Sequence, residues 1–430
     1  MKKEKFIAST IILIIGGLIT KFLGMLIKII MTRIVGVEGI SLYVLVFPTF
    51  ALFMTLSQLG FPIAISKLVA EEKYNNKNLI FSIFPFSILL NLILMFLIFI
   101  FAPYISVYLL KDARCYYPIL AIAFVLPFDS TSAILRGYFF GKQRMIPHVV
   151  SNATEQVVRL FLILIFIPQL LEQGIVYAVV GLILVNVVSE LFSSLVLFFF
   201  MPKHIKITSD DKKINKNSIL NILNIALPTT GGRIIGSIGY FLEPILITSS
   251  MLLSGYSKEF ITLQYGIIEG FVIPLLMLPS FFSNAISSAL IPVVSKASSD
   301  NNKNYIKRKL KQAVTISLFI GIITTGILMI SPSFFLNLIY RQSSGEKYLR
   351  FIAPFFLFHY IQSPLASILQ SMNKAKDMML DNLKGTIIRS ILIFVLGTLS
   401  IGIYGFLIAM IVNIIFVTFM HWQHIKKELY

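Results

Sequence analysis

Apolar runs long enough to cross a bilayer as α-helices recur along the whole chain, separated by short polar segments. They predict an all-α integral membrane protein with about twelve spans. The last two spans are separated by little more than Ser400–Gly402. The expected spans are 6–32, 41–65, 79–103, 116–139, 148–168, 175–200, 218–248, 259–292, 311–333, 349–371, 383–400 and 402–421.

The composition excludes a soluble enzyme. Of the 430 residues, 57% are hydrophobic and 13% are charged, whereas a soluble domain carries roughly 25% charged residues. The one cysteine, Cys115, excludes an internal disulfide and a metal site built from several cysteines. The sequence has no phosphate-binding Walker loop and no GxSxG motif. We therefore expect no enzyme activity, no catalytic residue, no metal and no resident cofactor.

The chain is strongly basic, with 37 Lys and Arg, 19 Asp and Glu, and a net charge of +18. In a soluble protein this balance would suggest a nucleic-acid partner. If the N-terminus is cytoplasmic, the inner loops hold 24 of the 37 cations and the outer loops hold seven. Cytoplasmic loops of membrane proteins carry such an excess. The asymmetry predicts two cytoplasmic termini and no nucleic-acid partner.

The two halves of the sequence resemble each other through short motifs that recur in the same order at a nearly constant spacing. Pro62–Lys67 matches Pro292–Lys296, and Ile134–Gly137 matches Ile368–Ser371. Parallel repeats about an axis along the membrane normal are a common transporter plan, with the substrate site between the halves. We expect six-helix lobes at 1–210 and 217–430, joined by a cytoplasmic linker at 202–217.

Cations inside the spans are the candidates for substrate binding, because a charge near the bilayer centre costs roughly 2.5–3.5 kcal/mol and marks function by default. Lys21 and Lys28 project from one helix face, with Gly24 between them. They either line a cavity or pair with acids on neighbouring helices. Arg136 lies near the inner end of its span, where it contacts either lipid headgroups or the substrate.

Arg233 is the fourth candidate for substrate binding. It follows Pro228 and the pair Gly231-Gly232 early in its span. Proline and glycine predict a bend or a break over 228–232. Broken helices often flank substrate sites in transporters.

Acids inside the spans serve either structure or coupling to a cation. Glu155 and Arg159 have the i,i+4 spacing of a helical ion pair, and we expect them to neutralise each other. Asp129 follows Pro127, which frees a backbone carbonyl, so Asp129 caps local structure or takes part in coupling.

Glu243 and Glu269 either bind a coupling cation or pair with Arg233. Sodium, a proton and the membrane potential all remain open as the driving force.

Three segments resemble the stage V sporulation protein B family: Lys21–Lys28 with Thr32–Tyr43, Gln58–Glu71, and Leu135–Pro147 with Glu155–Arg159. That family belongs to the superfamily of multidrug, oligosaccharidyl-lipid and polysaccharide exporters, in its polysaccharide transporter branch. Lipid II flippases and multidrug and toxin extrusion proteins are relatives. The resemblance covers essentially the whole chain, the first half by motif and the second mainly by layout.

The resemblance implies a V-shaped, two-lobe, all-helical fold and alternating access. It also implies basic residues of the first helix around a cationic cavity. Lys21 matches such a position, and Arg33 lies in the matching Arg-Ile-x-Gly run. A second basic position of the lipid II flippases falls on Ile27, whereas Lys28 is the basic residue expected of the sporulation branch.

These residues favour a flippase in the bacterial cytoplasmic membrane, in cell-wall or spore-cortex synthesis. Its substrate is a polyprenyl-pyrophosphate-linked sugar or peptidoglycan precursor, whose negative charges attract cations around an aqueous cavity. The expected partners are this lipid-linked anionic glycan and membrane lipids, with the protein as a monomer. The alternatives are a cation-coupled multidrug exporter and a non-transporting membrane scaffold.

Overall fold

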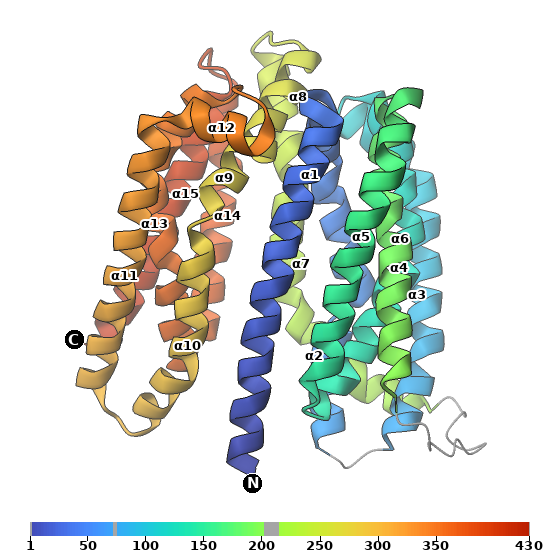
Figure 1. The fold of residues 1–430 in the computed structure, drawn as a ribbon, viewed down its shortest axis with the longest axis vertical. Helices are drawn as coiled ribbons and strands as arrows, with labels where there is room; N and C mark the ends of the chain where they lie inside the picture. The colour runs from blue at the N-terminus through green and yellow to red at the C-terminus, as the bar shows by residue number, and fades with distance from the viewer. Residues whose placement is uncertain (1, 72–74, 202–214, 430) are drawn as a thin grey trace. The chain divides into compact units, whose positions relative to one another are not determined.

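The computed structural model describes residues 2–71, 75–201 and 215–429, and in this part of the chain all regular structure is helical. This confirms the predicted all-α class. Ten helical segments of the described residues are long and apolar enough to cross a membrane. The long helices are α1 (Lys2–Gln58), α3 (Asn76–Tyr104), α4 (Tyr116–Gly141), α5 (Met145–Gln173), α6 (Ile175–Phe199), α7 (Lys216–Leu253), α10 (Ser280–Ser299), α11 (Lys303–Ile330), α13 (Glu346–Ser371), α14 (Ala375–Gly397) and α15 (Tyr404–Leu429) (Figure 1).

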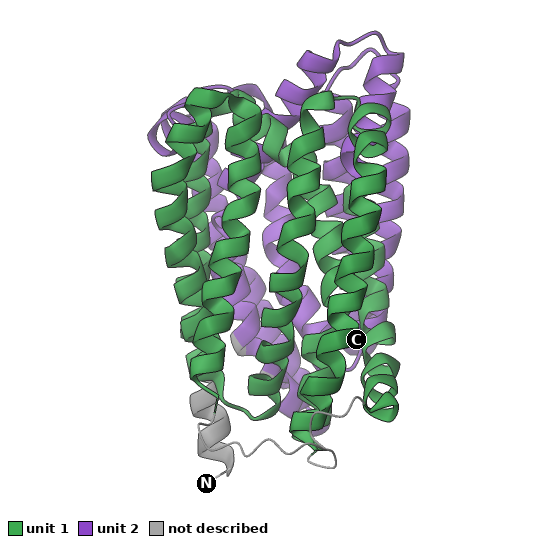
Figure 2. Ribbon diagram, turned by 90° about the vertical axis from the view of Figure 1, so that its right-hand side faces the viewer, with its two compact units in different colours: residues 1–241 green, residues 242–430 purple. Residues whose placement is uncertain are grey.

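Shorter helices connect or interrupt the long ones: α2 (Phe61–Ala70), α8 (Lys258–Ile267), α9 (Ile273–Met277) and α12 (Pro332–Tyr340). The chain forms two compact units, Met1–Phe241 (unit 1) and Leu242–Tyr430 (unit 2) (Figure 2). The boundary between them falls inside α7. Most of the predicted linker, residues 202–214, lies outside the described residues.

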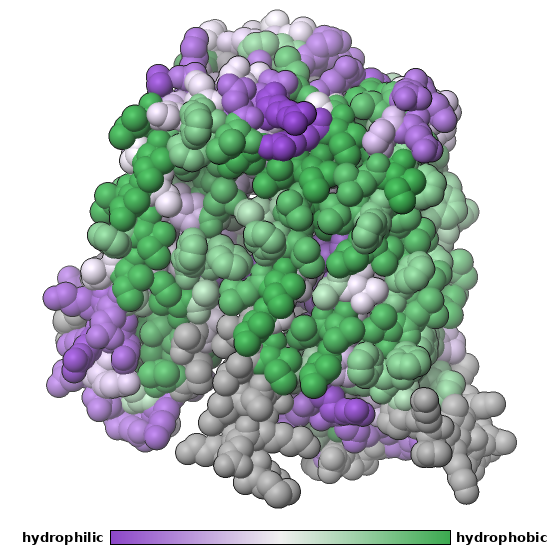
Figure 3. Space-filling view, viewed as in Figure 1, coloured by the Kyte–Doolittle hydropathy of each residue, from purple (hydrophilic) through white to green (hydrophobic). Residues whose placement is uncertain are grey.

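The surface of the helices is apolar along their middle. Large hydrophobic side chains are exposed there, such as Phe96 and Phe161 in unit 1 and Phe319 in unit 2. Figure 3 shows hydrophobic residues over the middle of the helices and hydrophilic residues towards their ends. Exposing such a large apolar surface to water is unfavourable, whereas the hydrocarbon core of a bilayer solvates it.

The first two predicted spans both lie in α1, where two helices meet at Gly36 without the loop expected at 33–40. The helix kinks at Gly36, whose φ of 67° and ψ of −166° lie in a region that essentially only glycine adopts. The change of direction therefore takes place at one residue. A glycine between two apolar runs does not distinguish a kink from a short loop at the level of sequence.

Of the two alternatives at 228–232, the break is absent, because α7 is helical throughout Lys216–Leu253, and the bend stays a prediction. The hydroxyls of Thr229 and Thr230 donate to the carbonyl oxygens of Ile225 and Ala226 at 2.8 and 2.6 Å. Such hydroxyls supply hydrogen bonds that help a membrane helix to tolerate proline. The interruption lies instead in the next predicted span, where a π-helical turn over 268–272 separates α8 from α9, and α10 begins at Ser280.

The helices repeat at the spacing that the sequence predicts. Pro62 and Pro292 of the matching motifs define an offset in residue number. The same offset separates both ends of α4 from the corresponding ends of α13, and the end of α6 from the end of α15. Left-handed residues recur at the same offset, because Lys111 and Arg341 have φ of 57° and 56°, and Gln143 and Asn373 have φ of 55° and 60°. A turn conformation that few non-glycine residues adopt is strong support for an internal repeat.

Gly60 supports the packing of α2 on the first half of α7, within unit 1. Its φ is 69°, and a Cβ there would lie 2.2 Å from Thr230 Oγ1 and 2.9 Å from the Ala226 carbonyl oxygen. Around it, Phe61, Ala64 and Ile65 share a core with Ile222 and Ala226.

We predict that Gly60→Ala destabilises the protein by about 2 kcal/mol or more, because left-handed strain and overpacking add. The measurement is thermal unfolding in detergent. Gly231→Ala is the matched control, since a Cβ at Gly231 meets no atom within 4 Å. Equal melting temperatures for the two variants would contradict the packing described for Gly60.

Candidate functional site

Four charged side chains meet inside unit 1, and we call them the unit 1 charge cluster: Arg136 of α4, Glu155 and Arg159 of α5, and Glu190 of α6. The Nη2 atom of Arg136 lies 2.9 Å from Glu155 Oε2 and 3.0 Å from Glu190 Oε2. Arg159 Nη2 lies 2.7 Å from Glu155 Oε1, so the predicted i,i+4 pair is present. Glu155 therefore holds both arginines, one through each oxygen.

The unit 1 charge cluster is buried and electrically balanced. The exposed fraction is 16% for the Arg136 side chain, 9% for Glu155 and 6% for Glu190. Two guanidinium and two carboxylate charges offset each other, which is what burial away from water demands. Arg136 thus points into unit 1 and meets acids there. Its charge is compensated before any substrate arrives.

A chain of polar groups, which includes the carboxyl group of Asp129, lies near the cluster. Gln58 Nε2 donates to both oxygens of Asp129, at 3.1 and 2.9 Å, so Asp129 is held from α1 rather than capping its own helix. Ser57 donates to Asn91 Oδ1 at 2.6 Å, and Asn91 Nδ2 donates to Ser130 at 2.9 Å. These bonds tie α1, α3 and α4 together. Gln58, Ser57 and Asn91 were not predicted, because only charged residues inside the spans were taken as candidates.

One face of α1 carries the two predicted lysines. Gly17, Lys21, Gly24 and Lys28 recur at helical spacing along this face. Lys21 is exposed and Lys28 half-buried. A Cβ at Gly17 would meet no atom within 4 Å, and one at Gly24 would meet only Gln156 Oε1 of α5, at 3.8 Å. This face therefore has room beside its cations.

Another face of α1 packs inside unit 1. A Cβ at Gly16 would lie 2.4 Å from Val149 of α5. Ile27, where the lipid II flippases carry a second basic residue, is 7% exposed and forms part of the core. A basic side chain at position 27 would be buried, which agrees with its replacement by isoleucine here. Lys28, one residue on, is better placed to reach water.

Arg233 is exposed on the part of α7 that belongs to unit 1. Among the described residues, neither Arg233 nor Lys21 makes an ion pair. One turn further along, the hydroxyls of Ser237 and Thr55 are 2.8 Å apart and join α7 to α1. Arg233 thus projects from a helix that is fixed to unit 1.

Unit 2 contains a separate buried pair. Arg389 Nη2 of α14 lies 2.5 Å from Glu243 Oε2 of α7, and the Tyr265 hydroxyl donates to Glu243 Oε1 at 3.3 Å. The Arg389 guanidinium also lies over the ring of Phe406, 5.6 Å from its centroid. Of the two alternatives for Glu243, the pairing with Arg233 is therefore absent, because Arg389 takes that place. Glu269, half-buried, lies in the π-helical turn over 268–272.

The two units use the same arginine position with different acids. Arg159 and Arg389 occupy equivalent positions in α5 and α14, counted from Met145 and Ala375 at the starts of these helices. At the position of Glu155, α14 carries Gly385, so the carboxylate for Arg389 comes from Glu243 of another helix. Adding the repeat spacing to the position of Arg159 gives Arg389, so the sequence alone could have identified Arg389 as a candidate residue.

No described cluster of three or more His, Cys, Asp or Glu side chains is arranged to hold a metal ion. The candidate site is therefore a set of fixed charges. The unit 1 charge cluster and the Glu243–Arg389 pair are each compensated within their own unit. Lys21, Lys28 and Arg233 belong to neither of these groups. Such a set can attract and orient an anion.

Comparison with known proteins places the chain in a family. The family model described as polysaccharide biosynthesis protein matches residues 6–298. The chain belongs to this family. A second model, MatE, matches residues 269–395. The family and the apolar helices together identify a multi-pass membrane protein.

Relatives of this family member include sporulation and flippase proteins. Stage V sporulation protein B of Bacillus subtilis (strain 168) is 38% identical over 440 residues, covering 100% of this chain and 85% of the relative, which confirms the resemblance. Lipid II flippase MurJ of the same strain is 23% identical, covering 90% of this chain and 77% of the relative.

A solved structure shares the fold. It is the inward-facing conformation of a MATE-family multidrug resistance transporter of the MOP superfamily. The TM-score is 0.74 at 16% identity, over 95% of this chain and 94% of that one.

We predict that Glu155→Gln destabilises this family member by about 3 kcal/mol, because it leaves Arg136 and Arg159 with one carboxylate between them. Thermal unfolding in detergent measures the effect. Arg350→Gln is the control, since it breaks an i,i+4 pair with Glu346 whose arginine is 54% exposed. Adding Arg159→Gln to Glu155→Gln should recover part of the loss; an additive loss would show that the two residues are not coupled.

Proposed function

We propose that this protein is a flippase that moves a polyprenyl-pyrophosphate-linked sugar or peptidoglycan precursor across the bacterial cytoplasmic membrane. The likeness to stage V sporulation protein B over the whole chain carries the proposal, and the likeness to the lipid II flippase supports it. Translocation requires binding and release but no bond cleavage, which suits a site of fixed charges. Cell-wall or spore-cortex synthesis is the process that would use such a product.

The proposed anion contacts are Lys21, Lys28 and Arg233. Lys21 and Arg233 are exposed, and both helices carry glycines with open space beside them, Gly17 on α1 and Gly231 on α7. A pyrophosphate is attracted by several cations that face water. Arg136 contributes only if Glu155 and Glu190 release it, so we rank it below the other three.

The proposal includes the architecture expected from the sequence: twelve spans in two six-helix lobes, 1–210 and 217–430, related by a pseudo-two-fold axis. The lobes would form a V and alternate in access to the two sides. Recurrent helix ends and left-handed turns support the repeat. Within unit 1, the start of α1 and the loop at 142–144 lie at the same end (Figure 1), which supports an inner side carrying Lys142 and Arg144. Both termini would be cytoplasmic.

Coupling to a cation is a further part of the proposal. Glu243 is already engaged by Arg389, so a sodium ion or proton at this site would have to compete with an internal guanidinium. Asp129 is likewise engaged by Gln58. Replacing sodium by potassium, and collapsing the proton gradient or the membrane potential in turn, would identify the driving force in proteoliposomes.

The second candidate function is a cation-coupled multidrug exporter. The MatE match over 269–395 and the MATE-family structure favour it. Such exporters favour cationic drugs, which exposed Lys21 and Arg233 would repel. Drug sensitivity of a deletion strain separates the two candidates, because the flippase proposal expects unchanged sensitivity to cationic drugs. If the purified protein transports neither lipid-linked sugars nor cationic drugs, the remaining alternative is a non-transporting membrane scaffold.

We predict that Lys21→Gln with Lys28→Gln slows flipping about tenfold or more, because each charge-assisted contact to phosphate is worth about 1.5 kcal/mol or more. The assay follows a labelled polyprenyl-pyrophosphate-linked sugar in proteoliposomes through its accessibility to an external reductant.

The matched control is Lys426→Gln with Lys427→Gln, which removes the same charge from exposed positions at the end of α15. Lys21→Arg with Lys28→Arg should retain most of the rate. Unchanged flipping in the Lys21 and Lys28 double variant, with its melting temperature preserved, would refute the assignment of these residues.

A further inference from the structure

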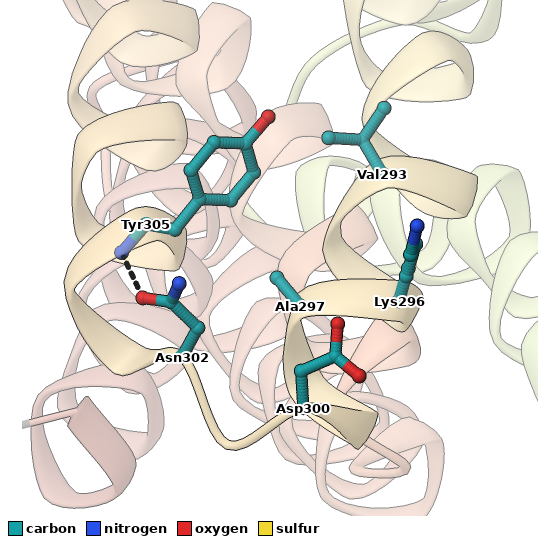
Figure 4. A pocket seen from close by; sticks show the side chains of 6 residues that line it. All are labelled: Val293, Lys296, Ala297, Asp300, Asn302 and Tyr305. Carbon is teal, nitrogen blue, oxygen red and sulfur yellow. Dashed lines mark hydrogen bonds between the residues drawn. The ribbon is translucent and has the colours of Figure 1, made fainter.

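A cavity in unit 2 lies where α10 and α11 meet, far along the sequence from the proposed anion contacts. Its volume is about 440 Å³, and it is lined by Val293, Lys296, Ala297, Asp300, Asn302 and Tyr305. In Figure 4, Val293, Lys296 and Ala297 come from α10 and Asp300 directly follows it, while Asn302 directly precedes α11 and Tyr305 lies in its first turn. The Tyr305 ring extends into the space between the two helices.

Two opposite charges in this lining, Lys296 and Asp300, are exposed and available to a ligand. Neither the Lys296 nor the Asp300 side chain makes an ion pair or hydrogen bond with any residue that the structure describes. Asp300 directly follows the last residue of α10, four residues after Lys296, with the cation first, which is the less favourable order for a helical pair. A ligand that carries both a negative and a positive group would satisfy both.

The cavity spans the boundary between apolar and polar surface. Val293, one turn before Lys296, is an exposed apolar residue, at 39%. On α11 the first turns are charged and the apolar run follows. Tyr305 is 38% exposed at this level, and tyrosine is enriched where headgroups meet hydrocarbon.

The walls of the cavity are fixed by packing within unit 2. Ala297 belongs to a buried core with Ile306 and Leu310 of α11, and Leu429 of α15 closes the same core. The Asn302 side chain accepts a hydrogen bond from the Tyr305 N–H at 3.0 Å and so caps α11. The hairpin is therefore held in place without a ligand.

A basic surface surrounds the lining. Lys303, Lys307, Arg308 and Lys309 follow within two turns of α11, and the Lys309 ammonium lies 5.5 Å from the centre of the Tyr305 ring. Cations at a membrane surface attract lipid phosphates by about 1 kcal/mol each. These cations explain why a lipid phosphate would be attracted to the cavity. They do not explain the presence of Asp300 in the lining, because its carboxylate would repel a purely anionic headgroup.

We propose that this cavity binds the headgroup of a zwitterionic phospholipid with a primary ammonium, such as phosphatidylethanolamine. Lys296 and the Tyr305 hydroxyl bind the phosphate. Asp300 accepts hydrogen bonds from the ammonium group, and Val293 contacts the start of the acyl chains. The inference is independent of the proposed transport function, because the site lies within unit 2 and binds a bulk membrane lipid.

The test is lipid binding to the purified, delipidated full chain, measured by native mass spectrometry. Phosphatidylethanolamine, phosphatidylcholine and phosphatidylglycerol with identical acyl chains are compared. We expect phosphatidylethanolamine to bind most tightly, because a quaternary ammonium cannot donate N–H bonds and a glycerol headgroup has no cation. Free phosphoethanolamine should compete weakly at the same site, whereas inorganic phosphate should not compete selectively.

Two variants separate the roles of the charges. Lys296→Gln should weaken all three lipids about tenfold, by loss of the phosphate contact. Asp300→Asn should remove only the preference for phosphatidylethanolamine over phosphatidylcholine.

The controls remove exposed charges outside the lining: Lys311→Gln on α11 and Glu259→Gln on α8. If these controls reduce binding as much as the lining variants, the lipids bind the general surface and the proposal fails. It also fails if the wild-type chain shows no preference among the three headgroups. Flipping is not the readout, so loss of the transport proposal would leave this result intact.

Discussion

A guanidinium group buried among apolar helices needs a carboxylate beside it, and this requirement organises both units. In unit 1, Glu155 holds Arg136 and Arg159, and Glu190 completes the balance. In unit 2, Glu243 holds Arg389. Removing one partner from such a group costs more than the pair itself contributes, because the remaining charge stays buried. The helices that supply these residues are therefore constrained in register as well as in contact.

The same requirement sorts the cations by role. Arginines with carboxylate partners stabilise their unit and carry little net charge to the outside. Lys21 and Arg233 have no acidic partner among the described residues and remain exposed. An anionic substrate would meet these side chains first. Under the proposed function, stability and substrate attraction would depend on different residues, so either could be changed with limited effect on the other.

The sequence was sufficient for the features that depend on local composition. Apolar length predicted the helices, and the spacing of Glu155 and Arg159 predicted their ion pair. The pairing of Glu243 with Arg389 was not predictable in this way, because they lie on helices far apart in the chain and apolar periodicity does not say which helices touch. Pro228 was misleading, since Thr229 and Thr230 supply hydrogen bonds beside it. Gly36 was ambiguous because a kink and a loop both use glycine.

The different acids beside Arg159 and Arg389 bear on how the chain evolved. If the halves arose by duplication of one ancestral segment, one copy kept or gained the acid on the arginine's own helix, and the other came to rely on α7. The change left Gly385 at the equivalent position, where a Cβ would lie 2.5 Å from both Asn413 and Val417. Helix α15 therefore packs directly against the backbone of α14 at this position. The two copies are therefore no longer interchangeable: an acid at position 385 would require α15 to move away from α14.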